Sequence, residues 1–344
     1  MAVFGPVVAA LLLAGALLAS LCLGAASLTP RQVLGALLSR VGGAAGASGA
    51  AQDRVSATIV WELRLARTLL AGVAGAALGT AGAVLQGLFR NPLADPYALG
   101  VSSGAALGAV AALSLGIASP VASVTALQGF SFAGALGAAI LVYGIARASG
   151  QRAPTAALLL AGAAVGSFLG ATVSLIMTLR QRDLQRVFFW LLGGFGGKSW
   201  ADLAAALPAA AFALLVSMIL ARPLDILGSG EEAASSLGLD VARTRALAVA
   251  ASSLGTAAAV SAGGVIGFIG LLGPHFARLL VGPGHRRLIP ASAAAGAALL
   301  MAADAAARSI AAPIELPVGV VTAILGAPLF LWLLSRRGLG GEGS

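Results

Sequence analysis

Few residues in this 344-residue chain have the type and spacing that chemistry requires. The two histidines, His275 and His285, lie ten positions apart, and arginines follow them where a metal site would need carboxylates or thiols. Cys22 is the only cysteine, so it forms no disulfide within the chain. From these residues we expect no catalytic centre, no metal site and no cofactor.

A glycine-rich segment from Gly193 to Ser199 has the look of a phosphate-binding loop. That motif needs a glycine where this chain has Leu192, and it must lie between a strand and a helix. The flanking sequences here are long apolar runs instead. We therefore expect no nucleotide binding at this segment.

Two carboxylates lie in or beside apolar runs, where an ionisable group is a functional candidate by default. Asp304 falls inside such a run, and Glu315 stands at the start of the next. Arg308 follows Asp304 by four residues, the spacing at which two side chains meet on one helix face. We therefore interpret Asp304 and Arg308 as a structural ion pair.

The composition is that of a chain surrounded by lipid. Hydrophobic residues make up 59% and charged residues 10%, with a mean hydropathy of +0.99, whereas soluble domains carry about 25% charged residues. Apolar runs of about 17 to 25 residues suit membrane-spanning helices. The ten runs cover residues 4–26, 65–86, 97–117, 121–146, 154–179, 201–221, 244–262, 264–281, 288–311 and 316–335. This predicts an all-α integral membrane protein with about ten transmembrane helices, forming one domain over residues 1–344.

Two further features concern the organisation of the helices. The glycines at 263 and 264 must either turn the chain between two runs or mark a re-entrant segment. The sequence Leu78-Gly79-Thr80-Ala81 recurs as Leu254-Gly255-Thr256-Ala257, which hints at two related halves, as transporters often have.

The net charge of +9 would suggest nucleic acid as a partner of a soluble protein. In this chain the basic residues lie between the apolar runs, so we assign them to membrane topology and to docking, and expect no nucleic-acid partner. Basic residues divide almost equally between the two sides of the ten-helix arrangement, so the charge does not decide its orientation.

The stretch from residue 63 to 104 is the most informative, because an apolar run ends at a polar segment with two prolines and then resumes. Asn91 suits a side-chain-capped turn and Pro92 stops the helix. Asp95 and Pro96 form an N-cap followed by a first-position proline. We expect a structured loop between two membrane crossings.

Blocks along nearly the whole chain resemble the permease subunits of ABC importers for vitamin B12, iron siderophores and haem. Ala66 stands where the usual first block has proline. The matching blocks are Arg64-Leu65-Ala66-Arg67, Gln86-Gly87, Asn91 to Pro96, Gly100 to Gly104, Gly230 to Leu239, Gly264 to Gly270, Pro274 to Arg278, Glu315 to Gly319 and Leu325 to Pro328. The resemblance implies a type II ABC importer permease fold with both termini cytoplasmic. It makes the loop with Gln86, Asn91, Pro92, Asp95 and Pro96 cytoplasmic, and it places a gate region beside the pathway at Gly193, Gly194, Gly196 and Gly197.

A short coupling helix is predicted over residues 229–239. Ser229 and Glu232 have capping-box spacing, Glu231 lies near the positive helix end, and Gly238 suits a left-handed C-terminal cap. One face would present Ala233, Ala234 and Leu237. So short a helix needs a partner to be stable; the resemblance implies that the partner is the groove of an ATP-binding subunit.

The same resemblance makes Arg64, Arg67 and Arg308 the arginines that receive acidic residues of a substrate-binding protein on the outer side. Arginine suits this role through its permanent charge and its forked donors. Exposed pairs of this kind orient a partner more than they hold it.

Together these features predict a permease subunit, not an enzyme, in the cytoplasmic (inner) membrane. The expected partners are membrane lipid, a second permease copy, two ATP-binding subunits that hydrolyse ATP, and a periplasmic or lipid-anchored substrate-binding protein. The expected cargo is an iron chelate, either a ferric siderophore or haem, with cobalamin as the alternative. An ion-driven secondary transporter is disfavoured because few carboxylates lie inside the apolar runs.

Overall fold

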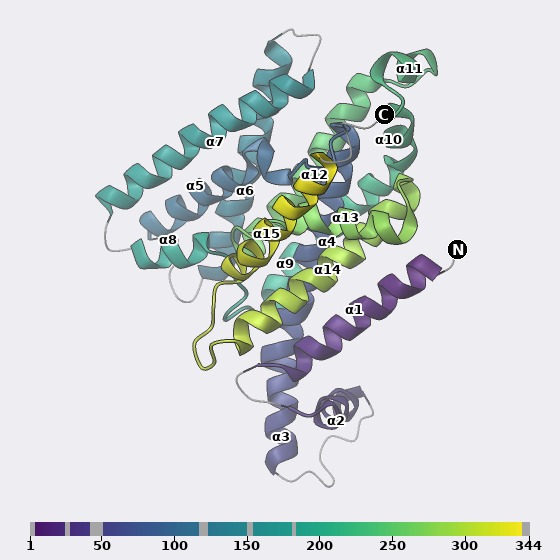
Figure 1. Cartoon of the computed structure of the whole chain (residues 1–344). Helices are drawn as coiled ribbons and strands as arrows, with labels where there is room; N and C mark the ends of the chain where they lie inside the picture. Colours follow the sequence, from purple (N-terminus) through teal and green to yellow (C-terminus); the bar gives the residue numbers. More distant parts are fainter. Residues whose placement is uncertain are drawn as a thin grey trace.

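The computed structural model describes residues 4–24, 28–41, 51–116, 123–149, 154–180 and 184–338, and within these ranges its regular structure is helical (Figure 1). The helices are α1 (Phe4–Cys22), α2 (Pro30–Val41), α3 (Ala51–Thr58), η1 (Ile59–Leu65), α4 (Ala66–Leu88), η2 (Pro96–Leu99), α5 (Val101–Ser114), α6 (Ser123–Ala148), α7 (Pro154–Leu179), α8 (Leu184–Leu191), α9 (Trp200–Ile219), α10 (Ala221–Leu227), α11 (Glu231–Ser236), α12 (Val241–Gly263), α13 (Ile269–Val281), α14 (His285–Ser309) and α15 (Val318–Gly338).

Apolar helices of the described part match the predicted runs. Six are long and apolar enough to cross a membrane: Val55–Leu88, Ala126–Ala148, Thr155–Leu179, Trp200–Ile219, Val241–Gly263 and His285–Ser309. Shorter apolar helices cover Val7–Cys22, Val101–Ser114, Ile269–Val281 and Val318–Trp332. The predicted all-α membrane fold is confirmed, with two of its apolar helices, α5 (14 residues) and α13 (13 residues), shorter than expected.

The N-terminal part contains helices that the apolar runs did not predict. α2 and α3 are too polar to register as apolar runs, and η1 joins α3 to α4 as a π-helix. The continuous helix Val55–Leu88 has 34 residues, so it is about 50 Å long, against about 30 Å for the hydrocarbon core. Trp61 holds this region together, because its Nε1 donates to the Ala36 carbonyl at 2.8 Å and its ring stacks on Trp200.

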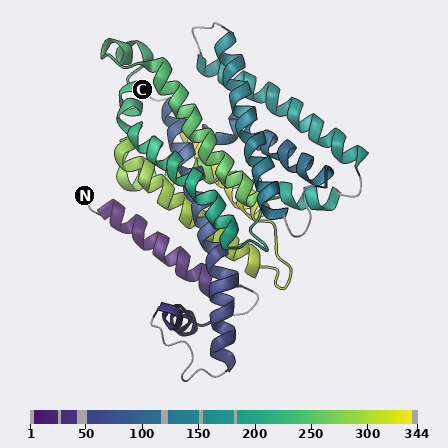
Figure 2. The same ribbon diagram turned by 180° about the vertical axis from the view of Figure 1, so that it is seen from behind.

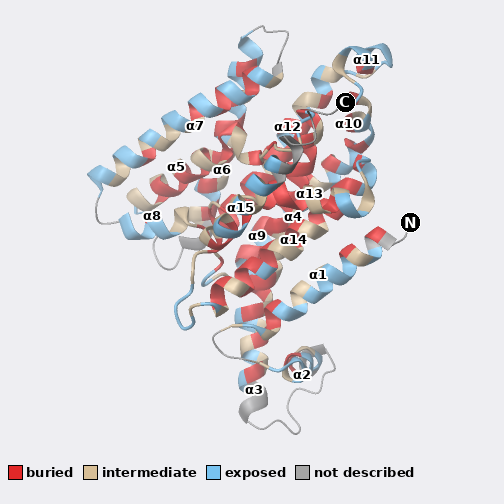
Figure 3. Ribbon diagram, viewed as in Figure 1, coloured by how far each residue is buried: buried red, intermediate tan, exposed pale blue. Residues whose placement is uncertain are grey.

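The helix α4 lies at the centre of the bundle, in contact with α9, α12, α13 and α14 (Figure 1). From behind, α9 and α12 cover it (Figure 2). Buried residues concentrate on α4, α12 and α13, whereas α1 and α7 expose much of their surface (Figure 3). Exposed apolar side chains such as Leu160 and Phe168 on α7 are those expected to face lipid.

Close backbone contacts join α4 to its neighbours. A Cβ atom added to Gly75 would collide with the backbone of Gly296, and one added to Gly79 would collide with the carbonyl of Ser292. At Gly82 the collision would be with the carbonyl of Gly270 in α13. Lipid supplies little hydrophobic drive for helix association, so small residues that permit close packing stabilise such bundles.

The two copies of the Leu-Gly-Thr-Ala sequence lie on α4 and α12, which pack against each other. Gly255 approaches the carbonyl of Ala77, and the Ser252 hydroxyl donates to the carbonyl of Ala81 at 3.3 Å. Because the residue number rises on one helix as it falls on the other, the two helices are antiparallel. The repeated sequences therefore meet at one crossing of the two helices.

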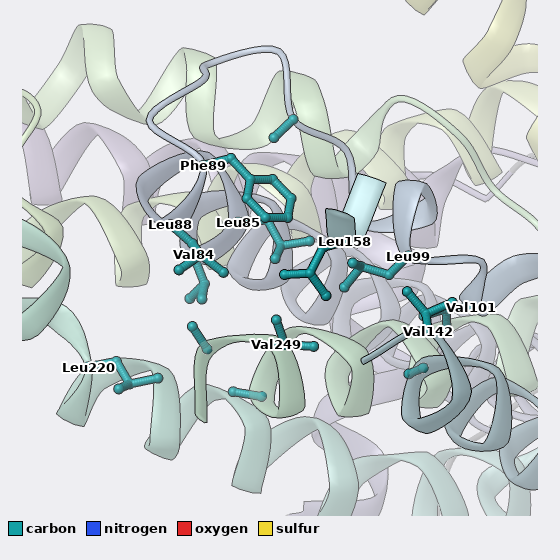
Figure 4. Close-up of a cluster of buried hydrophobic side chains, with 14 of the residues drawn as sticks. Val84, Leu85, Leu88, Phe89, Leu99, Val101, Val142, Leu158, Leu220 and Val249 are labelled. Carbon is teal, nitrogen blue, oxygen red and sulfur yellow. The ribbon is translucent and has the colours of Figure 1, made fainter. Parts of the chain in front are cut away.

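The largest buried cluster joins the C-terminal end of α4 to helices that follow it. Leu85, Leu88 and Phe89 of this end pack in a cluster with Leu158 of α7 and Val249 of α12 (Figure 4). The chain then passes through η2 into α5, whose first residue, Val101, belongs to the same cluster. This cluster fixes the position of the loop between α4 and α5.

Gly82→Ala should lower the stability of the folded chain, because the new methyl group has no room beside Gly270. Overpacking of this kind costs about 1 to 3 kcal/mol. Gly144→Ala on α6 is the matched control, since a Cβ atom there meets nothing within 4 Å, and it should be neutral or stabilising. Thermal unfolding in detergent measures both, and equal melting temperatures for Gly82→Ala and the wild type would contradict the packing argument.

Candidate functional site

The loop after α4 is an ordered turn, held by side-chain hydrogen bonds of the kind that the sequence predicted. The Asn91 side chain accepts from the Leu93 N–H at 2.9 Å, and Asp95 accepts from the Tyr97 N–H at 2.8 Å as the N-cap of η2, with Pro96 in its first turn. Burial raises the pKa of the Asp95 carboxyl above its ordinary value. The loop also turns inward, since Pro96 is buried against Gly270 while Pro92 is half-buried.

Gln86, in the last turns of α4, ties this loop region to α13. Its Nε2 donates to the Leu271 carbonyl at 3.4 Å, and its Oε1 accepts from Arg278 at 3.3 Å. The Tyr97 hydroxyl donates to the Ile266 carbonyl at 2.9 Å, in the non-helical segment between α12 and α13. The break predicted at Gly263 and Gly264 is thus a short non-helical segment between α12 and α13, held by the loop that follows α4.

The predicted coupling helix is present as α11, but it starts later than expected. The predicted capping box of Ser229 and Glu232 is wrong: the N-cap is Gly230, with φ 112°, and it has no side-chain cap. The Ser229 hydroxyl donates instead to the Ile226 carbonyl at 2.7 Å. Glu231 pairs with Arg245 of α12, with 2.7 Å between Oε1 and the guanidinium nitrogen.

The C-terminal end of α11 has the predicted cap. Gly238 has φ 81°, in the left-handed region that glycine favours. Its N–H donates to the Ser235 carbonyl at 2.9 Å, and the Leu239 N–H donates to the Ala234 carbonyl at 3.0 Å. These two bonds form a Schellman motif, which ends the helix sharply.

The three residues predicted to form the docking face of α11 differ in their exposure to solvent. Ala234 is fully buried within the chain, so its assignment to an exposed docking face is wrong. Ala233 is exposed, and Leu237 is 72% exposed although it is a large apolar residue. Ala234 thus anchors α11 to the bundle, and Leu237 is left facing outward at the end of the bundle that carries α10 and α11.

At the opposite end of the bundle, five charged residues form a cluster. Arg67 of α4 contacts Asp304 of α14 and Glu315 in the connection to α15, each at 2.9 Å. Arg308 contacts Asp304 at 3.1 Å, which confirms the predicted pair. The Arg64 guanidinium donates to the carbonyls of two residues near the C-terminal end of α1, at 2.7 and 3.1 Å. We call Arg64, Arg67, Asp304, Arg308 and Glu315 the arginine cluster.

The arginine cluster differs from the exposed rim that the sequence predicted. Arg64, Arg67 and Arg308 are only 6%, 7% and 5% exposed. The Asp304 side chain is fully buried, whereas the Glu315 side chain is 51% exposed. Asp304 lies 237 residues from Arg67 in sequence, so only its position inside an apolar run pointed to a buried partner. Burial in the cluster corrects the expectation of three exposed arginines.

The predicted gate glycines lie in the connection between α8 and α9, where Gly193 is buried, Gly194 is half-buried, and Gly196 and Gly197 are exposed. Gly193 and Gly197 both have φ 68°, and the Gly194 N–H donates to the Gly263 carbonyl at 2.7 Å. The Gly193 carbonyl accepts from the Val318 N–H at 2.9 Å, and a Cβ atom added to Gly196 would approach the Glu315 carboxylate at 3.3 Å. This segment therefore bridges α12 and α15 and adjoins the arginine cluster.

The residues from Gly193 to Ser199 do not form a phosphate loop. Ser199 is the N-cap of α9 in a reciprocal capping box with Asp202, and the flanking elements are the helices α8 and α9. Among the described residues, no group of three or more histidine, cysteine, aspartate or glutamate side chains is placed to hold a metal ion.

The helices and the two ends define a polytopic α-helical membrane protein with a buried charged cluster at one end and a short projecting helix at the other. The chain belongs to the FecCD transport family, whose model matches residues 11–336. It is the permease subunit of an ABC importer of the metal-chelate and vitamin B12 type, a multi-pass protein of the cytoplasmic membrane. Such a permease works with ATP-binding subunits and a substrate-binding protein.

Relatives of known assignment and a solved structure agree with this class. The chain is 50% identical over 279 residues to the cobalamin import system permease protein BtuC of Halobacterium salinarum, covering 81% of this chain and 74% of the relative. It is 40% identical to the hemin transport system permease protein HmuU of Yersinia pestis, covering 81% and 84%. A solved structure described as an inward-facing ABC transporter of the metal-chelate type matches with a TM-score of 0.82 at 30% identity, covering 95% and 97% of the two chains.

Asp304→Ala should destabilise the chain strongly, because it leaves Arg67 and Arg308 buried without that carboxylate. Removing one partner of a buried ion pair costs about 3 to 5 kcal/mol. Glu315→Gln is the matched control, since its half-exposed side chain should cost less than about 1 kcal/mol. Thermal unfolding and the yield of monodisperse protein measure both. Equal loss in the two variants would mean that Asp304 does not hold the cluster together.

Proposed function

We propose that the cargo of this permease is a corrinoid of the cobalamin type. The supporting observation is the 50% identity to a cobalamin permease, against 40% and 41% to permeases for haemin and for ferric dicitrate. This order reverses the preference for an iron chelate drawn from the sequence. The iron chelate remains the second candidate, because permeases named for vitamin B12 in enterobacteria are also only 41% to 43% identical.

The cargo is tested with the permease reconstituted in liposomes together with its ATP-binding subunit and its substrate-binding protein. ATP-dependent uptake of radiolabelled cobalamin should occur, and excess ferric siderophore or haem should not compete with it. Uptake of a ferric chelate with no uptake of cobalamin would contradict the proposed cargo and favour the second candidate.

For the assembly, we infer two copies of this chain around a two-fold axis, with the pathway between them and two ATP-binding subunits below. The support is the resemblance to type II importers, in which a symmetric pair of like surfaces closes the assembly. Co-purification of two differently tagged copies from one membrane tests this inference. Failure of the tags to co-purify, with a different permease chain present instead, would indicate a heterodimer.

The projecting helix α11 is proposed to dock on an ATP-binding subunit and to carry its motion to the bundle. The support is the exposed Leu237 beside Ala233, and the fixed attachment of α11 through Ala234 and Glu231. This assigns the end with α10 and α11, and the loop with Gln86, Asn91, Pro92, Asp95 and Pro96, to the cytoplasmic side. Hydrolysis of ATP would take place on the separate subunit.

Leu237→Asp should weaken binding of the ATP-binding subunit, because a charge would replace an apolar contact. Loss of a central apolar contact costs on the order of 2 kcal/mol, or roughly thirtyfold in affinity. Ser235→Asp is the control, since it puts the same charge on an exposed position of the same helix. Co-purification and uptake measure the effect, and membrane insertion should persist. Normal uptake by Leu237→Asp would remove α11 from the docking site.

The opposite end is proposed to receive the substrate-binding protein, with Arg64, Arg67 and Arg308 supplying a positive field. Their burial means that they shape and charge this surface, while Glu315 is the most exposed member of the arginine cluster. The glycines Gly193, Gly194, Gly196 and Gly197 adjoin this surface. We propose that they form the gate, since the backbone hydrogen bonds that hold them can exchange when the segment moves.

Glu315→Gln should strengthen association with an acidic substrate-binding protein. The cluster carries three positive and two negative charges, so its net charge would rise from about +1 to about +2. The affinity should rise a few-fold at low ionic strength. This increase should vanish near 1 M salt, where the Debye length is about 3 Å. Surface plasmon resonance across salt concentrations measures it, and weaker binding at low salt would contradict the proposed positive surface.

A further inference from the structure

The start of α14 is capped by a residue of another helix. Asp225 of α10 accepts the backbone N–H of His285 at 2.9 Å with its Oδ1. The same oxygen lies 2.6 Å from Nδ1 of the His285 ring, which donates to it when protonated at that nitrogen. The N-cap of α14, Gly284, supplies no side-chain cap. Asp225 therefore satisfies an N–H that the first turn of a helix leaves free, and places negative charge at its positive end.

The His285 ring also touches α4. Its Nε2 is buried and has no hydrogen-bond partner in the described structure. This edge of the ring lies against Gly87, where an added Cβ atom would collide with Nε2. The ring thus fills a space between α10, α14 and the last turn of α4. Its position depends on Asp225, because that carboxylate is the partner that orients it.

The helix α10 is firmly connected to α11. Leu224 and Leu227 of α10 are buried, and the three residues between the helices form hydrogen-bonded turns, with the Gly230 N–H donating to the Leu227 carbonyl at 3.0 Å. Glu231 then fixes the start of α11 to Arg245 of α12. A displacement of α11 would therefore move α10 with it.

We propose that Asp225 and His285 form a joint that transmits the displacement of α11 to α14 and α4. Both are positioning residues for import, because they act through the helices and do not contact cargo. This inference rests on the proposed docking of α11. The Asp225 side chain is 43% exposed, so as a simple ion pair it would contribute little to stability. We infer that Asp225 matters because it connects α10 to α14, and α14 ends at the arginine cluster on the opposite side of the bundle.

The first test compares Asp225→Ala with Arg286→Ala in the complete reconstituted complex. Arg286 is the exposed neighbour of His285 in the first turn of α14. In Asp225→Ala, the ATP-binding subunits should still co-purify and ATP should still be hydrolysed. The number of cargo molecules imported per ATP should fall about fivefold, the factor expected for about one lost hydrogen bond. Arg286→Ala should import as the wild type does.

A rescue experiment separates transmission from local damage. In a Cys22→Ser background, which removes the only natural cysteine, the double variant Asp225→Cys and His285→Cys should show the same uncoupling when reduced. Oxidation should tether α10 to α14 and restore import per ATP, and loss of thiol labelling measures formation of the tether. A merely structural defect would not be repaired in this way.

If Asp225→Ala imports as many cargo molecules per ATP as the wild type, the proposed joint is contradicted. It is also contradicted if the disulfide tether forms and import per ATP stays low. Either result leaves the proposed docking of α11 intact, provided that the wild-type complex binds its ATP-binding subunits and imports cargo. If the wild-type chain itself binds no ATP-binding subunit, the proposed function fails instead.

Discussion

The close backbone contact between α4 and α14 is the constraint on which the rest of the structure depends. Gly75 and Gly79 bring α4 against Gly296 and Ser292 of α14. Because these small residues let the two backbones interlock, the position of one helix relative to the other is fixed where they cross. At one end this places Arg67 against Asp304, and at the other it places Gly87 against His285. The charged cluster and the joint are both consequences of one helix pair.

This helix pair also connects the two candidate contact surfaces. The arginine cluster joins α4 and α14 to the end of α1 and to Glu315, next to the glycine segment between α8 and α9. At the other end, α14 begins at the contact with α10, which continues into α11. A packed pair of helices with a defined contact at each end is a physical route by which two sites can influence each other.

Local sequence patterns predicted most of the local features correctly, the exception being the capping box at Ser229. The ten apolar runs, the turn at Asn91, the cap at Gly238 and the pairing of Asp304 with Arg308 all depend on residues within a few positions of each other. The other failures were long-range. No local signal shows that Arg67 meets Asp304, that Ala234 turns into the bundle or that Asp225 caps α14. The capping box at Ser229 failed because a glycine with positive φ took the N-cap position.

We propose that this chain lines a transport pathway, and that a separate ATPase drives its conformational change through α11. The most direct measurement is cargo flux into liposomes that contain the chain, with and without its ATP-binding subunits, under ATP or under an ion gradient. Uptake should occur only when the ATP-binding subunits, ATP and the substrate-binding protein are all present. Uptake driven by an ion gradient without those subunits would contradict this proposal and indicate a secondary transporter.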